Sequence, residues 1–545
     1  MAAPTLPVVR PINSPDVLIV GAGAAGGVLC KELAEAGFKV VVLEAGPHWV
    51  PERDFVSDEK GAEQLYWTDP RVTAGNDPIE LGSNVTGKGV GGSTVHYSMV
   101  ALRMHESDFM VRSRDGVAHD WPIRYEDLEP YYEAVEKELG IAGPVTWPWG
   151  PRRRGPYPYR EHPLNSVANL FVRGCERLDV TWAPCPLATI SAPKEGRHPC
   201  VYRGWCIYGC STNAKSSTLV TYIPRAIKAG AEIRANCMAT RVNLGPDGAQ
   251  GARARSVTYV RTTEEGRYVE EEQAAELIIL SCYSIETPRL LLNSAQPGHP
   301  DGPANSSGLV GKGLMIHSAH IVHGRYPEPV YPYKAPPCLA LSQHFYETNP
   351  TNGYARGFTL ECVGPFPQSF AKQAHASLGL WGTDLRALMF DFNHYASWAL
   401  NGECLPDDRN TVTLDPDEKD QYGLPVARVT FGWGENDKRI IAAGIERARE
   451  IHQAAGAEVT WVADDTAHLM GACRMGSDPR HSVVDQWCRT WDLPNLFICD
   501  GSVFVTSSGV NPSLTIQAIA ARTAEYIKQE SQRNVLASGT GRRAG

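Results

Sequence analysis

The sequence predicts an α/β protein that begins with a Rossmann-type dinucleotide-binding unit. A short apolar run at residues 16–20 leads directly into the turn Gly21-Ala22-Gly23-Ala24-Ala25-Gly26, and a helical stretch follows at residues 28–36. A second apolar strand, residues 39–43, ends at Glu44. The length of 545 residues adds the expectation of two closely connected domains.

The three glycines of this turn have separate roles in the expected fold. Gly21 permits the tight turn, Gly23 lets a pyrophosphate approach the backbone, and Gly26 allows the helix to pack closely. Glu44 lies 18 residues after Gly26, about where a carboxylate meets the ribose hydroxyls of a dinucleotide. A purely structural strand-to-helix turn is the alternative. The agreement of strand, helix, second strand and terminal acid favours dinucleotide binding.

The composition limits the function classes that fit this chain. With 43% hydrophobic and 21% charged residues, it has ample material for a globular core. The net charge of -9 predicts no nucleic-acid partner, and no apolar run approaches the roughly 18 residues of a membrane span. Residues 1–15 lack the features of a secretory signal, so we expect a cytoplasmic protein, with periplasmic co-export beside a signal-bearing partner as the alternative. The fourteen cysteines favour thiols over a disulfide framework.

Further elements of the nucleotide-binding domain are expected far along the chain. A buried strand at 276–280 runs into a helix start at 284–289, with Thr287 as a cap before Pro288. A strand at 496–499 ends at Asp500-Gly501 and precedes a long helix at 514–527. The other expected elements are a helix at 222–229, strands at 232–235 and 240–242, and an antiparallel pair at 257–260 and 267–270. This domain is therefore expected to be assembled from separated segments.

With these motifs the chain resembles the glucose-methanol-choline (GMC) oxidoreductase family along nearly its whole length. The narrower stretches Asp120-Trp121-Pro122-Ile123 and Glu403-Cys404-Leu405-Pro406, with a cysteine cluster, resemble the bacterial branch of gluconate, fructose and FAD-dependent glucose dehydrogenases and pyranose oxidase-like enzymes. The stretches that match the family are residues 16–46, 89–97, 276–294, 305–317, 468–485 and 495–517.

The resemblance implies a GMC fold, in which an α/β FAD-binding domain joins an α+β substrate domain built on a sheet. The flavin ring would lie between them. The FAD-binding domain is expected at residues 15–105, 215–310 and 466–532, and the substrate-binding domain at 106–214 and 311–465. Residues 1–14 and 533–545 are expected to be flexible termini.

The resemblance also implies two catalytic residues. His468, in His468-Leu469-Met470-Gly471-Ala472-Cys473, corresponds to the family's catalytic base. Hydride leaves a carbinol carbon only as the hydroxyl loses its proton, and an imidazole with a pKa near 6.5 suits that transfer. Asn511 corresponds to the second position, where an amide orients the substrate oxygen and stabilises developing negative charge. The alternatives are a satisfied core histidine and an Asn-Pro turn before the last helix.

The glycine-rich stretch from Gly89 to His96 corresponds to the loop that wraps the flavin, with Gly91, Gly92 and Ser93 close to the cofactor. His96 falls where some family members carry a covalent bond to the flavin 8α carbon, and the alternative is a histidine packed beside the ring. The remaining implied FAD contacts are Val242, Asp500 and Gly501.

Cys200, Cys206 and Cys210 form C-x5-C-x3-C, which resembles the three-ligand spacing of a [3Fe-4S] cluster in the glucose dehydrogenase branch. Such a cluster would pass electrons to a cytochrome or small subunit. Without it, oxygen or a diffusible acceptor would reoxidise the flavin. Buried unpaired cysteines and a disulfide within the loop are the alternatives.

The expected function is FAD-dependent oxidation of a hydroxyl of a sugar, polyol or glycoside, with hydride transfer to flavin N5. The alternatives are a flavin oxidase of an apolar or sterol-like alcohol, an NAD-dependent dehydrogenase, and a flavoprotein without catalytic activity. The segment expected to cover the flavin carries five rings that suit sugars and apolar alcohols equally well and that core packing would also explain, namely Trp381, Phe392, His394, Tyr395 and Trp398.

Overall fold

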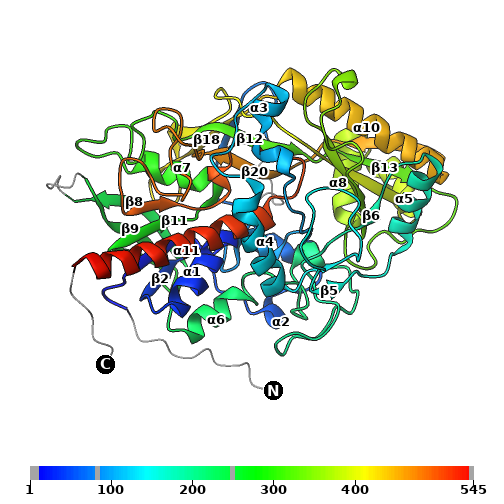
Figure 1. The fold of residues 1–545 in the computed structure, drawn as a ribbon. Helices are drawn as coiled ribbons and strands as arrows, with labels where there is room; N and C mark the ends of the chain where they lie inside the picture. Colours follow the sequence, from blue (N-terminus) through cyan, green and yellow to red (C-terminus); the bar gives the residue numbers. More distant parts are fainter. Residues whose placement is uncertain (1–11, 80–85, 246–251, 539–545) are drawn as a thin grey trace.

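A computed structural model describes residues 12–79, 86–245 and 252–538 (Figure 1). Its first sheet has five parallel strands in the order β21-β11-β1-β2-β7. The three central strands are short apolar runs that are almost fully buried, as expected where helices cover both faces of a parallel sheet. The strands are β1 (Val17–Val20), β2 (Val40–Leu43), β7 (Glu232–Arg234), β11 (Leu277–Leu280) and β21 (Leu496–Ile498).

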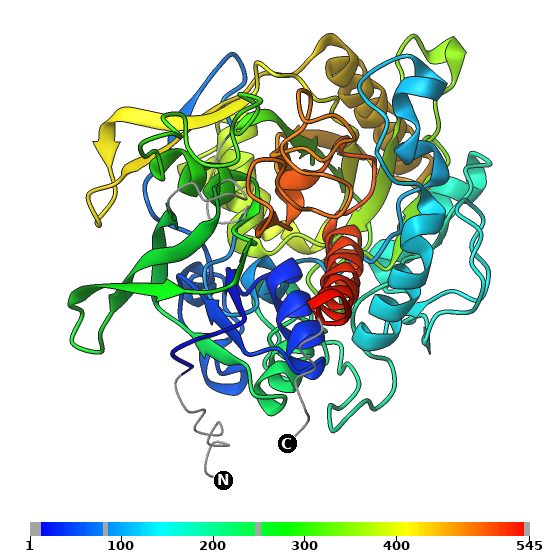
Figure 2. The same cartoon turned by 60° about the vertical axis from the view of Figure 1, so that its left-hand side comes forward.

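Helices from distant parts of the sequence cover this sheet. Figures 1 and 2 show α11 (Ser513–Ser538) alongside α1 (Ala24–Glu35) and α4 (Tyr125–Leu139). Helix α6 (Tyr222–Lys228) packs on α1, and α7 (Tyr283–Asn293) follows β11. The predicted strand, glycine turn and helix at the start of the chain are present, as is the long final helix.

Helix α7 differs in detail from its prediction. It begins at Tyr283, so Thr287 and Pro288 lie inside the first turns and Thr287 is not the cap. The Thr287 hydroxyl instead donates to Asp500 Oδ2 at 2.6 Å. The role of Thr287 therefore depends on a hydrogen-bond acceptor, the Asp500 carboxylate, that lies at the end of β21.

A separate antiparallel sheet follows β7 in the chain. It consists of β8 (Cys237–Leu244), β9 (Ala254–Thr262) and β10 (Tyr268–Ala274), in the order β10-β9-β8. The predicted pair at 257–260 and 267–270 is confirmed, because Glu270 pairs with Val260 in this sheet.

The second large layer is a mixed sheet that runs β3-β18-β17-β12-β16-β15-β14-β6 in the described residues, with β13, β19 and β20 joined beside this path. Helices α5 (Ser166–Arg177) and α10 (Glu435–Ala455) pack together and against β15 and β16 (Figure 1). The strands are β3 (Val72–Ala74), β6 (Ala183–Pro184), β12 (Lys312–Ser318), β13 (Ile321–Arg325), β14 (Ala340–Ser342), β15 (Phe358–Val363), β16 (Tyr395–Gly402), β17 (Thr411–Lys419), β18 (Pro425–Thr430), β19 (Val459–Ala463) and β20 (Thr466–Ala472).

The remaining regular elements are short or peripheral. They are α2 (Pro51–Asp54), α3 (Val111–Asp115), α8 (Pro367–Leu378), α9 (Gly382–Phe390), β4 (Ala142–Gly143) and β5 (Tyr159–Arg160). None of the helices in the described ranges combines the length and apolarity needed to cross a bilayer.

The predicted fold class, an α/β layer joined to a second sheet-based domain, is confirmed. Two strands from the ranges expected for the FAD-binding domain belong to the large sheet. There β3 pairs with β18, and β20 pairs with β12. Helix α11 continues to Ser538, into the range expected to be a flexible terminus. Residues 1–11 and 539–545, which belong to the expected flexible termini, lie outside the described residues.

Candidate active site

A cavity of about 480 Å³ lies between the two sheets and is lined by residues of both. It brings together predicted residues that are hundreds of positions apart. Those that line it are Gly21, Gly23, Glu44, Gly92, Ser93, His96, His468, Asp500, Gly501 and Asn511. Three predicted cofactor residues, Gly26, Gly91 and Val242, are not among the lining residues. The residues of β8 that reach the cavity are Cys237 to Thr240, whereas the Val242 N–H donates to Ser294 Oγ at 2.8 Å.

The first glycine turn is shaped by close approach of backbone to backbone. Gly21 has φ +100°, and a Cβ there would lie 2.4 Å from the Ser281 carbonyl oxygen. A Cβ at Gly26 would lie 1.9 Å from the Gly21 carbonyl oxygen, so only glycine lets α1 start where it does. Gly92, with φ +52°, would place a Cβ 2.7 Å from Gly23 Cα. The two glycine-rich loops therefore touch and leave their backbones facing the cavity.

The carboxylate of Glu44 links these two loops at the end of β2. It accepts hydrogen bonds from the N–H groups of Ala22 at 2.9 Å, Gly46 at 3.0 Å and Gly89 at 3.1 Å. A carboxylate has about four acceptor positions, so one remains for a hydroxyl in the cavity. Asp500, at the end of β21, accepts from Tyr283 N, Thr287 Oγ1 and Ser502 N. It joins the starts of α7 and of the 3-10 helix η7 (Gly501–Val503).

His468 reaches the cavity because β20 is irregular at this position. Between the pairs Met315–Met470 and His317–Ala467, β20 contains one residue more than β12, and His468 has φ +66°. A bulge of this kind changes the direction of a side chain, and a left-handed non-glycine residue is a strained conformation that clusters at functional sites.

Hydrogen bonds define which nitrogen of His468 is the acceptor. His317 Nε2 lies 2.7 Å from the Ser508 carbonyl oxygen, so it carries a hydrogen and donates. Burial lowers the pKa of His317 to about 4, so its neutral ring accepts at Nδ1. His468 Nδ1 lies 3.1 Å away and is therefore the donor. His468 Nε2 is left as the acceptor on a ring that lines the cavity. Burial, together with the adjacent His317, lowers the pKa of His468 to about 3, so this ring is also neutral near pH 7.

Asn511 also lines the cavity and has a polar neighbour that sequence reasoning missed. Its side chain lies close enough to Glu361 to lower the pKa of that carboxyl group, and Glu361 Oε1 accepts a hydrogen bond from Asn401 Nδ2 at 2.6 Å. Asn511 Oδ1 is buried without a partner among the described residues. A lone acid inside the apolar strand Phe358-Thr-Leu-Glu-Cys-Val363 was the available signal for Glu361. His317 lay within the matched stretch 305–317, but its role required the fold.

The loop of residues 506–509, which precedes Asn511, is held from several sides. Trp121 Nε1 donates to Thr506 Oγ1 at 2.8 Å, and Thr359 Oγ1 donates to the Gly509 carbonyl oxygen at 2.7 Å. The Ser507 hydroxyl donates to the Cys404 carbonyl oxygen at 2.9 Å and accepts from the Cys404 N–H at 3.0 Å. The loop before Asn511 is therefore fixed by contacts from β15, from Cys404 just after β16 and from Trp121 before α4.

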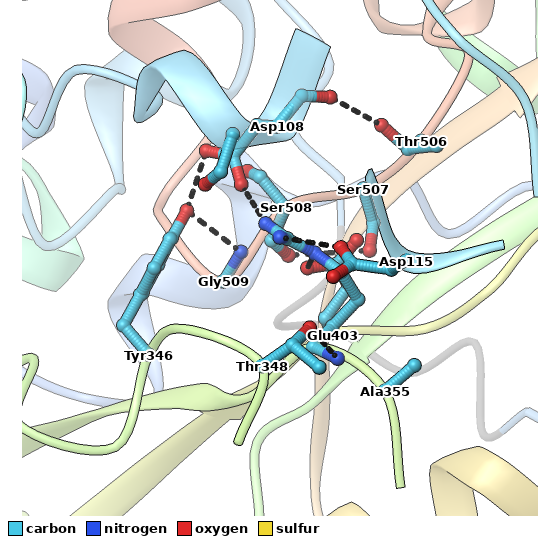
Figure 3. A network of polar contacts seen from close by, with 12 residues as sticks. Asp108, Asp115, Tyr346, Thr348, Ala355, Glu403, Thr506, Ser507, Ser508 and Gly509 are labelled. Atoms are coloured by element: carbon cyan, nitrogen blue, oxygen red, sulfur yellow. Dashed lines mark hydrogen bonds and ion pairs between the residues drawn. The ribbon is translucent and has the colours of Figure 1, made fainter. Parts of the chain in front are cut away.

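Tyr346 connects this loop to a buried ion cluster (Figure 3). Its hydroxyl accepts from Gly509 N at 3.2 Å and donates to Asp108 Oδ2 at 2.6 Å. The buried guanidinium of Arg356 forms ion pairs with three carboxylates, those of Asp108, Asp115 and Glu403.

His96 is the residue at which a covalent flavin bond was expected. It is buried, it lines the cavity, and its Nε2 has no hydrogen-bond partner in the described residues. Burial, with the nearby positive charge of Lys215, lowers the pKa of His96 to about 3. This neutral, unpartnered nitrogen, the contact between the glycine loops and the remaining acceptor position of Glu44 fit a flavin dinucleotide.

The structure does not support the predicted iron–sulfur cluster. Within the described residues, no three His, Cys, Asp or Glu side chains are grouped as a metal site requires. The Cys200 thiol accepts from Tyr202 N at 3.4 Å, and the Cys210 thiol contacts Thr212 Oγ1 at 3.4 Å. All fourteen cysteines are free, as the composition suggested. Of the three thiols, Cys206 is buried, and Cys200 and Cys210 are half-buried.

The aromatic segment expected to cover the flavin is instead mainly core. None of its five rings is among the residues that line the cavity. Phe392 and Tyr395 pack with Phe370, Trp398 stacks on His452, and Trp381 is 76% exposed.

Comparisons with known proteins agree with this geometry. Residues 16–319 and 406–520 match the N-terminal and C-terminal models described as GMC oxidoreductase. The chain is 36% identical to a 2-methyl-1,2-propanediol dehydrogenase of Mycolicibacterium austroafricanum, across 94% of this chain and 95% of that protein. It is 30% identical to a fructose dehydrogenase large subunit of Gluconobacter japonicus, across 94% and 98%. Among solved structures, a pyridoxine 4-oxidase from Mesorbium loti superposes with a TM-score of 0.65 at 17% identity, covering 94% of this chain and 99% of the other.

Proposed function

The chain belongs to the GMC oxidoreductase family, and we propose that it is an FAD-dependent enzyme that oxidises a hydroxyl of a sugar, polyol or glycoside to the carbonyl. The observation that carries this proposal is the convergence of His468 and Asn511 on one cavity, beside the two touching glycine loops. A proton acceptor and an amide then face the space where a carbinol would lie.

The residues that would hold FAD are the glycine turn at Gly21 and Gly23, the loop with Gly92 and Ser93, and Glu44 for the ribose. When bound, FAD accepts the hydride from the carbinol carbon at its N5. His96 would lie against the flavin, with Nε2 available for a covalent bond.

The chain's own residues supply the proton chemistry. His468 Nε2 accepts the hydroxyl proton, because its hydrogen bond to His317 leaves this nitrogen unprotonated. Asn511 orients the hydroxyl oxygen, and the contacts to residues 506–509 limit its movement. Both rings are neutral before the transfer, and His468 becomes an imidazolium when it takes the proton.

The named activities of the two similar dehydrogenases support a polar, hydroxyl-rich substrate over a sterol-like alcohol. One of these relatives is named as a large subunit, which supports a protein electron acceptor for this chain as well.

The test is anaerobic mixing of the FAD-loaded protein with a panel of sugars, polyols and apolar alcohols while flavin absorbance is followed. We expect bleaching by hydroxyl-rich substrates. His468→Ala should lower the rate by about 10²- to 10⁴-fold with FAD still bound. His481→Ala, at an exposed position, is the matched control and should leave the rate unchanged. Unaltered bleaching in His468→Ala would remove this residue from the mechanism.

A further inference from the structure

Glu361 lies on the cavity-facing side of β15. Successive side chains of a strand point to opposite faces, and both Glu361 and Val363 line the cavity. In the adjacent strand β16, Ala399 is the residue paired with Glu361, and Ala399 and Asn401 also line the cavity. The carboxyl group therefore belongs to the substrate side of the site.

The carboxyl group of Glu361 is held by neutral donors. Asn401 Nδ2 donates at 2.6 Å, and the side chains of Asn511 and Cys338 lie close enough to lower its pKa. Glu361 is 4% exposed, and no cation contributes to its pKa in the part of the chain that the structure describes. Burial raises the pKa of Glu361 to about 7, while the neighbouring side chains of Cys338, Asn511 and Asn401 oppose this rise.

A buried carboxyl group without a cation is costly to retain, because its desolvation is offset only by hydrogen bonds. A substrate that brings a further donor offsets this cost. A substrate with hydrocarbon at the same place leaves the carboxyl group underpaired, and a site of this kind discriminates strongly against an analogue that lacks the donor.

The position of Asn511 indicates where this further hydrogen-bond donor of the substrate would lie. Its side chain contacts Glu361, while its Oδ1 is unpartnered and buried at the cavity. The carbinol hydroxyl gives its one hydrogen to His468 Nε2, so Asn511 holds the carbinol oxygen by donating from Nδ2, and the neighbouring carbon of the substrate then lies toward Glu361.

We infer that Glu361, held by Asn401, is a specificity-determining residue that accepts a hydrogen bond from a second donor of the substrate, carried by the carbon next to the oxidised carbinol. This inference rests on the proposed function, because it uses the same site. Two chemical groups supply such a donor, a hydroxyl in a vicinal diol and an ammonium in an amino alcohol.

The experiment measures kcat/KM for anaerobic flavin reduction with three matched secondary alcohols, butan-2-ol, butane-2,3-diol and 3-aminobutan-2-ol. In the wild-type protein we expect the diol, the amino alcohol or both to exceed butan-2-ol by roughly 10-fold or more. A preference for the diol alone identifies a hydroxyl, and a greater preference for the amine identifies an ammonium.

Variants then assign the preference to Glu361. Glu361→Leu should bring kcat/KM for the diol and the amino alcohol down to that for butan-2-ol. Glu361→Gln keeps an acceptor oxygen but loses the charge, so it should lower the kcat/KM ratio of the amino alcohol to butan-2-ol more than that of the diol. Cys362→Ala is the control, because it changes the next residue of the same strand, which does not line the cavity. We expect its ratios to match the wild type.

A binding measurement separates this inference from the proposed function. Pinacol and tert-butanol are tertiary alcohols that cannot be oxidised at the carbinol carbon and that differ in the second hydroxyl. If the second donor is a hydroxyl, pinacol should perturb the flavin spectrum at a roughly 10-fold lower concentration than tert-butanol.

Equal kcat/KM for all three secondary alcohols, or ratios unchanged in both Glu361 variants with FAD bound, would overturn the inference and leave the proposed function intact. Absence of flavin reduction by every alcohol tested would count against the proposed function, while a Glu361-dependent pinacol preference would still support the inference.

Discussion

The Nδ1 atoms of His317 and His468 lie 3.1 Å apart, with the two rings nearly perpendicular at 86°. Two nitrogens at this distance share one hydrogen, and the Ser508 carbonyl oxygen decides which ring supplies it. Because Ser508 takes the only hydrogen of neutral His317, His468 must donate. The backbone carbonyl of Ser508 therefore sets the tautomer of the proposed base.

Replacing His317 should therefore impair proton transfer without removing FAD. His317→Leu leaves His468 free to adopt either tautomer, and we expect the rate of flavin reduction to fall by about 10- to 100-fold. His317→Asn supplies an acceptor oxygen near the former Nδ1 and should recover part of this loss. The measurement is stopped-flow anaerobic reduction of both variants. Equal rates in the wild type and His317→Leu would contradict the tautomer assignment.

His452 should make the fold sensitive to acid. Its Nδ1 lies 2.9 Å from the Tyr326 hydroxyl and its Nε2 lies 2.9 Å from the Val322 carbonyl oxygen, and burial lowers its pKa to about 3. The unfolded imidazole takes up a proton below about pH 6.5 and the folded one does not, so stability falls as the pH drops below 6.5. The loss is up to about 1.4 kcal/mol per pH unit.

In His452→Gln, the fall in unfolding free energy between pH 6.5 and 5.0 should be smaller than in the wild type by about 2 kcal/mol. Urea unfolding at several pH values measures it. His481→Gln, at an exposed position, should keep the wild-type slope. An unchanged slope in His452→Gln would show that this ring is not a buried neutral group.

Arg356 should be essential to stability because it is the cation among three buried carboxylates. Arg356→Met leaves these acids uncompensated and should cost about 3–5 kcal/mol of unfolding free energy. Arg409→Met removes an ion pair whose arginine is 87% exposed, and it should cost less than about 1 kcal/mol. Comparable urea midpoints for the two variants would refute the importance of the buried cluster.

His96 should anchor the flavin. Its unpartnered Nε2 lines the cavity, so we expect yellow colour to remain in the pellet after acid precipitation of the wild-type holoprotein. His96→Ala should release all of its flavin into the supernatant under the same treatment. Complete release from the wild type would mean that His96 only packs beside the cofactor.

Local patterns in the sequence were sufficient to predict the elements of the nucleotide-binding layer. The turn from Gly21 to Gly26 between two apolar strands, and the strand that ends at Asp500, have strong local signals because tight turns and buried strands constrain residue type. The candidate residues His468 and Asn511 came from resemblance, and both line one cavity in the structure. The cysteine spacing was a weaker signal, since separation along a loop does not determine where thiols point.

The sequence by itself determined the α/β class, the glycine turns and the residue types available for catalysis, because these depend on local backbone sterics and hydrophobic periodicity. Only the tertiary structure decided that His317 controls the tautomer of His468, that Glu361 adjoins Asn511, and that Thr287 binds Asp500 instead of capping its helix. Each of these contacts joins residues far apart in the chain, and their geometry arises from strand register, a bulge and burial, which no local pattern encodes.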